Sequence, residues 1–181
     1  MSKVLTLNLN ATDIKMAVKS DTYITGQVDK ASDMAKNAAK AYAVQAGNEK
    51  YHEVKLYRTM KAALAKMEAA IAEYVETSDA SAQINDTLTA ASTTFTVSIT
   101  VNDRASAAFA TTLAYLAQEY IINAMLYYWW QPIDAALAKQ YLDFSASNVL
   151  DIRRCLSKSA PDAAAVSYTD ISGSVTPVGS N

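Results

Sequence analysis

The sequence predicts an α+β fold that is mainly helical, a bundle of long helices with an inserted β-hairpin and an extended C-terminal arm. Apolar residues repeat at spacings of three and four over long stretches, as in amphipathic helices. Two other stretches alternate apolar and polar residues, as half-buried strands do. The final stretch has two prolines, two glycines and no Lys or Arg, and is not expected to fold alone. We therefore expect one domain over residues 1–158 and an arm over 159–181.

The N-terminal part begins with a strand predicted over residues 3–9, where three leucines share one face. The run NATD then supplies capping residues for a short helix over 13–19, and the polar stretch 20–27 is predicted to be a loop. An alanine-rich helix over 28–46 follows, with Gly47 as its C-terminal cap.

The central part of the chain combines the clearest helix with a hairpin. The helix is predicted over 49–76, and its apolar residues form a heptad-like seam: Tyr57, Met60, Leu64, Met67, Ile71 and Tyr74. Strands are predicted over 83–89 and 93–101, the second with one apolar face and one face of hydroxyls. An isolated hairpin is only marginally stable, so the N-terminal strand could complete a three-stranded sheet.

The last two predicted helices meet at a corner. The first starts at residue 102 or 103 and runs to Trp130, which makes it about 40 Å long. Pro132 disfavours helical geometry at Gln131 and suits the first turn of a new helix, predicted over 132–157 with Asp134 in its first turn. That helix is expected to bury Ile133, Leu137, Tyr141, Phe144, Ile152 and Cys155.

Composition argues against several classes of function. The chain has 181 residues, a net charge of −2 and a pI near 5.4, which does not favour a nucleic-acid-binding protein. One cysteine and one histidine, Cys155 and His52, provide no disulfide, no zinc-ligand pattern and no supported nucleophile–base pair. No glycine-rich phosphate loop, secretion signal or 18-residue apolar run occurs. We expect a soluble protein made in a cytoplasm, with no enzymatic activity, cofactor, metal or membrane partner.

The run IINAMLYYWWQP ends in four successive aromatic residues, Tyr127, Tyr128, Trp129 and Trp130. Successive helical residues point about 100° apart, so these rings encircle the helix and cannot all face a core on one side. Two interpretations stay open. The rings either wedge the corner between helices and sheet, or they anchor a subunit interface, where large aromatic residues are common.

Charge along the helix over 49–76 opposes the helix dipole, at a small cost per exposed residue. Its first part is basic, with Lys55, Arg58, Lys61 and Lys66 among its residues, and its end is acidic, with Glu68, Glu73 and Glu76. This pattern is either tolerated on a solvated face or matches the opposite charges of a neighbouring copy or another partner.

The arm over 159–181 also has two interpretations. It is either an end without a function, or a segment that docks on a partner through five dispersed apolar residues: Val166, Tyr168, Ile171, Val175 and Val178. In extended conformation it could reach about 70 Å.

The order of long helices, inserted hairpin and C-terminal arm resembles that of bacteriophage head-to-tail connector proteins, the adaptor or neck-ring subunits beneath a portal. The segment YIINAMLYYWWQPIDAALAKQYLDFSASNVLDIRRCLSKS, residues 120–159, looks like the late helical pair of small proteins from crAss-like and other Bacteroides tailed phages. The resemblance covers most of the chain as an order of elements and contains no short invariant motif.

The resemblance implies a non-enzymatic virion protein, present in the host cytoplasm during assembly. It implies a homo-oligomeric ring, commonly of about twelve copies, around a channel through which DNA passes without sequence-specific binding. It also implies that the arm docks onto the portal or other neck and tail proteins. The alternative function is a cytoplasmic helical-bundle binding module, monomeric or dimeric. A small hydrolase or nuclease is the least favoured class.

Overall fold

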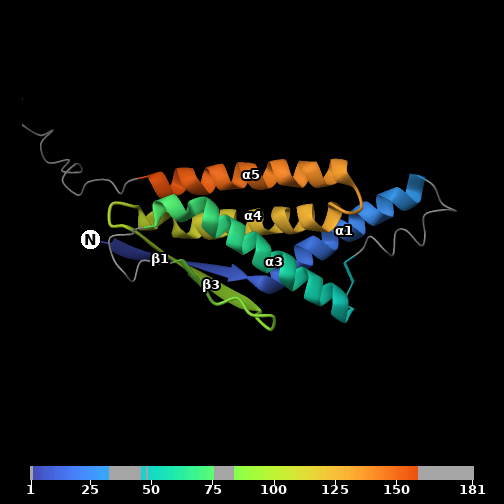
Figure 1. The fold of residues 1–181 in the computed structure, drawn as a ribbon, viewed down its shortest axis with the longest axis horizontal. Helices are drawn as coiled ribbons and strands as arrows, with labels where there is room; N and C mark the ends of the chain where they lie inside the picture. Colours follow the sequence, from blue (N-terminus) through green and yellow to red (C-terminus); the bar gives the residue numbers. More distant parts are fainter. Residues whose placement is uncertain (1, 33–45, 48, 76–83, 159–181) are drawn as a thin grey trace, which may run out of the picture.

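The structure, a computed structural model, describes residues 2–32, 46–47, 49–75 and 84–158. Its elements in chain order are β1 (Ser2–Asn10), α1 (Ala11–Ser32), α3 (Lys50–Ile71), β2 (Ile84–Asp86), β3 (Thr94–Asn102), α4 (Ala110–Trp130) and α5 (Ala135–Ser157) (Figure 1). Single 3₁₀ turns cover Ala72–Tyr74 and Ala107–Phe109. The predicted class, α+β and mainly helical, is confirmed.

The three strands form one antiparallel sheet in the order β1-β3-β2, so the N-terminal strand does complete the hairpin. The β1–β3 pairing runs without a bulge from Ser2 opposite Asn102 to Asn10 opposite Thr94. β2 is shorter than predicted and pairs only with the middle of β3. One face of the sheet packs against the helices and buries every second residue of the long strands: Leu5, Leu7, Leu9, Phe95, Val97, Ile99 and Val101.

The first helix differs from the prediction, because α1 continues through the predicted loop over 20–27. Asn10 caps it, since the Asn10 Oδ1 accepts hydrogen bonds from the backbone N–H groups of Thr12 and Asp13. Thr22 lies on its buried face, and its hydroxyl donates to the Lys19 carbonyl and accepts from the Ala46 N–H. With both hydrogen bonds made, the Thr22 hydroxyl is satisfied inside the helix, at a point where the sequence pattern predicts a loop.

The predicted helix over 28–46 lies largely outside the described residues, and its first residues belong to α1. The Gly47 N–H donates to His52 Nδ1 at 2.9 Å, so Gly47 is tied to the start of α3. The predicted seam of α3 is confirmed: Met60, Leu64, Met67 and Ile71 are buried, with Tyr57 and Tyr74 packed at its edges. The α-helix ends at Ile71 and tightens into the following 3₁₀ turn, earlier than the predicted end at residue 76.

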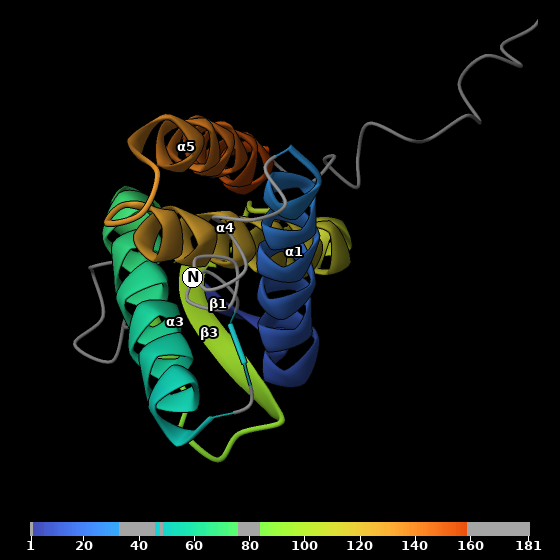
Figure 2. The same ribbon diagram turned by 90° about the vertical axis from the view of Figure 1, so that its right-hand side faces the viewer.

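α4 is the central helix, and it packs against α1, α3, α5 and β1. Figure 2 shows α1 and α3 on either side of α4, with α5 above it. It begins at Ala110, later than predicted, because β3 extends to Asn102 and the chain then turns. In this turn the Ala105 N–H donates to the Asn102 carbonyl, and the Arg104 N–H to the Asn102 side chain.

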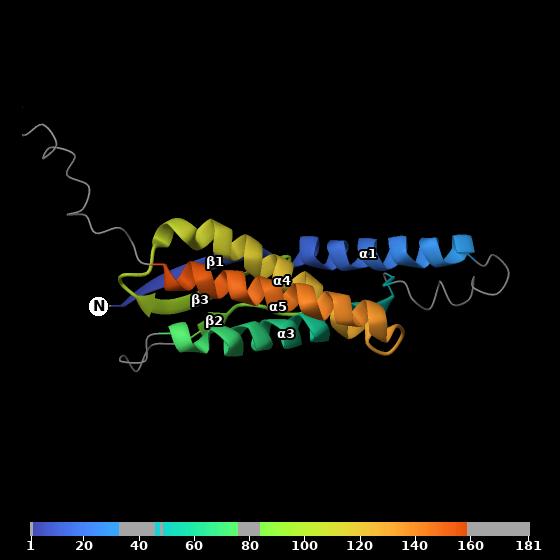
Figure 3. The ribbon, with the colours of Figure 1, turned by 90° about the horizontal axis from the view of Figure 1, so that it is seen from above.

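α4 and α5 form an antiparallel hairpin in which the two helices run alongside one another (Figure 3). Small buried residues recur at seven-residue spacing, which allows close packing: Ala117 and Ala124 on α4, Ala138 and Ser145 on α5. Between the helices, the Asn123 side-chain amide donates to Asn148 Oδ1 at 3.1 Å.

The turn between these helices contains Pro132, and α5 starts at Ala135 rather than at the proline. The Asp134 side chain caps it by accepting from the Ala136 and Leu137 N–H groups. The predicted burial of Ile133 and Phe144 is wrong, since they are 39% and 56% exposed. α5 lies on the outside of the bundle and packs mainly against α4, so its buried stripe is narrower than the sequence pattern suggests.

Candidate interaction surfaces

The aromatic run at the end of α4 is divided between core and surface. Trp129 and Trp130 are 2% and 1% exposed, so both indoles lie in the core and neither is exposed to a partner. The wedge interpretation therefore describes these two rings. The interface interpretation assumed that only one side of this helix is buried. α4 instead packs against other elements on several sides. The buried Trp130 Nε1 finds no hydrogen-bond acceptor among the described residues.

Tyr127 and Tyr128 are only half-buried, and their ring centroids lie 5.2 Å apart. The Lys66 Nζ lies 5.0 Å from the Tyr128 ring centroid, and a hydrogen bond with Tyr128 raises the pKa of Lys66. These two tyrosines keep their place as predicted interface residues.

Lys55 lies over the core at the same end of the bundle. Its Nζ is 3.9 Å from the centroid of a Trp129 ring, a cation–π contact that favours the charged amine. Burial lowers the pKa of Lys55, because removal from water disfavours the charge. The His52 ring also lies against Trp129, edge-on at 5.5 Å between centroids.

Two of the charged residues predicted at an interface have partners within the chain. The Lys61 Nζ donates to both carboxylate oxygens of Asp86 at 2.8 and 2.7 Å, which ties α3 to β2. Glu73 Oε1 lies 3.4 Å from the Nε of Arg153. The Arg153 guanidinium also donates twice to the Ala70 carbonyl near the end of α3, where a positive charge is favourable.

The other charged residues of α3 differ in their surroundings. Glu68 Oε1 is buried without a hydrogen-bond partner in the described part of the chain, and desolvation raises the pKa of Glu68. Arg58 is exposed. Glu76 lies outside the described residues. The predicted match between the basic and acidic ends of two copies stays a prediction, with Arg58 among its exposed cations.

A groove of about 350 Å³ runs along α3 beside the end of α4. We call it the α3 groove, and it is lined by Tyr51, Val54, Lys55, Arg58, Thr59, Ala62 and Tyr128. Tyr51 and Val54 are 64% and 51% exposed, so both leave apolar surface open to solvent. No Asp or Glu is among these lining residues, so the groove combines apolar surface with two positive charges.

An ion cluster between α1 and α3 was not expected from the sequence. Glu53 pairs with Lys19 and, at 3.6 Å, with Lys15. The hydrogen bond from Lys19 lowers the pKa of Glu53, with further contributions from both lysine charges. Lys15 and Lys19 are one helical turn apart, and this spacing can be read from the sequence. Their partner Glu53 lies more than 30 residues away in the chain, so the ion pairs could not be read from it. This cluster fixes α1 against the start of α3.

The open face of the sheet carries uncharged polar side chains almost throughout. Its exposed or half-exposed residues are Val4, Thr6, Asn8, Asn85, Thr87, Thr94, Thr96, Ser98 and Thr100. β1 pairs only with β3 in the described structure, so its other edge is unpaired over nine residues. Natural edge strands usually carry charges, prolines or bulges that prevent pairing, and β1 carries only Lys3 among these devices.

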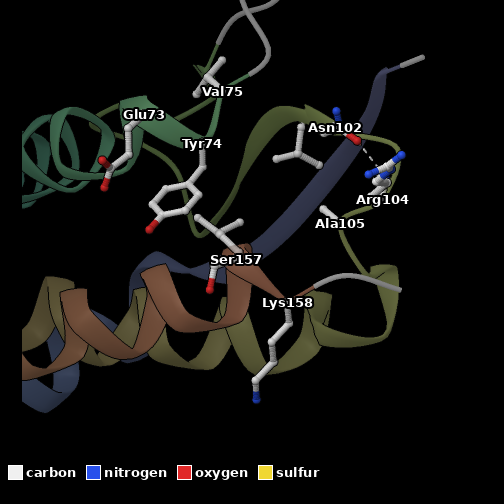
Figure 4. A pocket seen from close by; sticks show the side chains of 10 residues that line it. Glu73, Tyr74, Val75, Asn102, Arg104, Ala105, Ser157 and Lys158 are labelled. Atoms are coloured by element: carbon white, nitrogen blue, oxygen red, sulfur yellow. Dashed lines mark hydrogen bonds between the residues drawn. The ribbon is translucent and has the colours of Figure 1, made fainter. Parts of the chain in front are cut away.

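A pocket of about 390 Å³ lies at the end of α5, next to the end of β3 and the 3₁₀ turn after α3. Figure 4 shows that the side chains of Glu73, Arg104 and Lys158 project in different directions. The Lys158 Nζ lies 4.9 Å from the Phe109 ring centroid. The pocket therefore does not gather its charged groups around one point.

The remaining sequence-predicted residues have simple surroundings. His52 is half-buried at the start of α3, and Cys155 is half-buried on α5 and packs against the core. Within the described ranges, no group of three or more His, Cys, Asp or Glu residues could hold a metal ion. None of the helices that the structure describes is long and apolar enough to cross a membrane. The arm residues Val166, Tyr168, Ile171, Val175 and Val178 lie outside the described residues.

Comparison of the chain with protein-family models, with curated proteins and with solved structures finds no match.

Proposed function

We propose that this protein is a structural subunit of a phage neck, forming a homo-oligomeric ring between portal and tail around the DNA channel. The observation that carries the proposal is the open edge of β1 beside the uncharged face of the sheet. Nine residues that have no partner strand at this edge among the described residues, and no bulge or proline, favour pairing with another chain. The order of elements resembles that of head-to-tail connectors, and from this resemblance we infer that the assembly is a ring in the neck.

The rest of the surface fits a subunit with several contacts. Exposed apolar residues occur on separate helices, with Met16 and Tyr23 on α1, Tyr51 and Val54 on α3, and Phe144 on α5. A closed ring needs two different complementary patches on each subunit, and exposed apolar residues on more than one helix are compatible with that requirement.

The second candidate is a cytoplasmic helical-bundle binding module, monomeric or dimeric. The burial of Trp129 and Trp130 in the chain's own core favours it, because these rings then need no partner. The two candidates differ in mass in solution, which can be measured directly.

Light scattering over a concentration series, alone and with a portal protein encoded in the same genome, tests the proposal. The expected result is a large closed oligomer, either of the chain alone or formed with the portal. Thr6→Lys with Asn8→Lys places charges beside the β1 edge and should reduce the mass to that of a monomer. The matched control, Thr111→Lys with Thr112→Lys on exposed positions of α4, should leave the mass unchanged.

A monomer mass at every concentration, both with and without the portal protein, would contradict the neck proposal and favour the binding module. Equal masses for the β1 variant and the control variant in a large oligomer would show that the ring does not assemble through the β1 edge.

A further inference from the structure

We propose that the α3 groove is the docking site of the chain's own C-terminal segment, residues 159–181. The groove offers exposed apolar surface at Tyr51 and Val54, next to two cations, Lys55 and Arg58. A ligand for it needs apolar side chains next to a negative charge. This inference does not rest on the neck proposal, because it concerns a contact within one chain.

The segment has the complementary composition. It carries Asp162 and Asp170 and no Lys or Arg, so its side chains hold only negative charge. Asp170 stands between two apolar residues, Tyr168 and Ile171, so one short stretch brings a negative charge and apolar side chains to a groove that holds cations beside apolar surface. Charge complementarity of this kind sets register and suppresses wrong partners.

The segment also starts in the right place. Lys158, the last described residue, lines the same end pocket as Glu73 and Val75, so the arm leaves the body beside the end of α3. From Glu73 in that pocket back to Arg58 is 15 residues, about 23 Å at the helical rise. Twelve extended residues from Lys158 to Asp170 span about 40 Å. The apolar residues from Val166 to Ile171 therefore reach the groove without any rearrangement of the body.

The short link between Lys158 and the docking residues favours the chain's own groove over the groove of a neighbouring copy. A flexible link of this length gives an effective concentration on the order of millimolar, well above the concentrations of a dilute protein solution. In an isolated molecule the arm therefore docks on its own chain. Docking would hold the arm until a partner with higher affinity takes it.

Proteolysis of the full chain tests the docking. Chymotrypsin cleaves after Tyr168, and the cleavage rate follows the undocked population when docking is fast. Arg58→Glu replaces an attraction by a repulsion and should speed this cleavage about fivefold, a change typical of an exposed charge pair supported by neighbouring contacts. Adding Asp170→Lys to Arg58→Glu should restore protection, because the pair is re-formed with its charges exchanged.

The control and a second variant keep the test decisive. Lys139→Glu makes the same change of charge at an exposed position of α5 and should not alter the rate. Val54→Ser removes apolar surface from the groove without a change of charge and should also speed cleavage. It tests the docking independently if Arg58→Glu disturbs α3. Equal rates for the wild type, Arg58→Glu and Val54→Ser would overturn the proposal. Protection that rises with protein concentration would also overturn it, because the arm would then dock on another copy.

Discussion

Replacing Trp130 by Phe should cost less stability than replacing Trp129 by Phe, although both indoles are almost fully buried. Truncating an indole to a phenyl ring costs about 1–2 kcal/mol in lost burial and in the cavity that remains. For Trp130 this loss is offset, because the substitution also removes a buried N–H without a hydrogen-bond partner in the described structure, which costs about 1–3 kcal/mol. The net effect expected for Trp130→Phe is near zero.

Trp129→Phe has no such compensation. Lys55 lies 3.9 Å over the Trp129 ring, and Phe is a weaker cation–π partner than Trp. Adding a loss of up to about 1 kcal/mol for this contact gives a total of about 1–3 kcal/mol. The two substitutions should therefore differ by at least about 1 kcal/mol, although they remove the same atoms.

Urea unfolding followed by far-UV circular dichroism measures the difference, provided that the slope m stays constant among the variants. It should be run at several protein concentrations, because assembly would add to the apparent stability. Tyr115→Phe, at a 62% exposed position of α4, is the control and should be neutral. Equal losses for the two tryptophan variants, or a larger loss for Trp130→Phe, would refute the assignment of an unpaired N–H to Trp130.

Two further predictions concern the helix hairpin and a buried carboxyl group. Ala138→Leu should destabilise the fold by about 1–3 kcal/mol through overpacking, whereas Ala146→Leu, exposed on the same helix, should be neutral in the same urea assay. Burial raises the pKa of Glu68 above its ordinary value of 4.5, so the charged form weakens the fold once the pH exceeds that value. Glu68→Gln should therefore raise the urea midpoint at pH 7, and its advantage should shrink below about pH 4.5. The exposed control Asp143→Asn should show no such pH dependence, and an unchanged midpoint for Glu68→Gln at pH 7 would contradict the buried placement.

The elements with a regular pattern were predicted well from the sequence. The alternation in β1 and β3 and the three-four spacing of α3 depend on which residues face the core, and local periodicity records that directly. The boundaries that failed depend on distant partners. In α1 the Thr22 hydroxyl is satisfied by the distant Ala46 N–H, and α4 starts late because a turn at Asn102–Ala105 and a 3₁₀ turn separate it from β3.

The candidate surfaces were harder to predict than the elements. The aromatic run left open whether its rings pack at a corner or form an interface, because a helix with neighbours on several sides can bury aromatic residues at successive positions. Charges along α3 could be listed from the sequence, yet their pairing with Asp86 and Arg153 required the fold to bring separate segments together. The same holds for the ion cluster around Glu53.

The sequence by itself determined the mainly helical class, the strand-forming stretches and the lack of any motif typical of a metal site or a phosphate loop, while it left the three-stranded sheet as a possibility. These follow from periodicity and from residue types, which are properties of short stretches of chain. Only the tertiary structure decided that Trp129 and Trp130 are core residues, that β1 has an open edge, and that cations and apolar residues line one groove on α3. Exposure, edges and grooves depend on which elements pack together, and that is set by contacts between residues far apart in the chain.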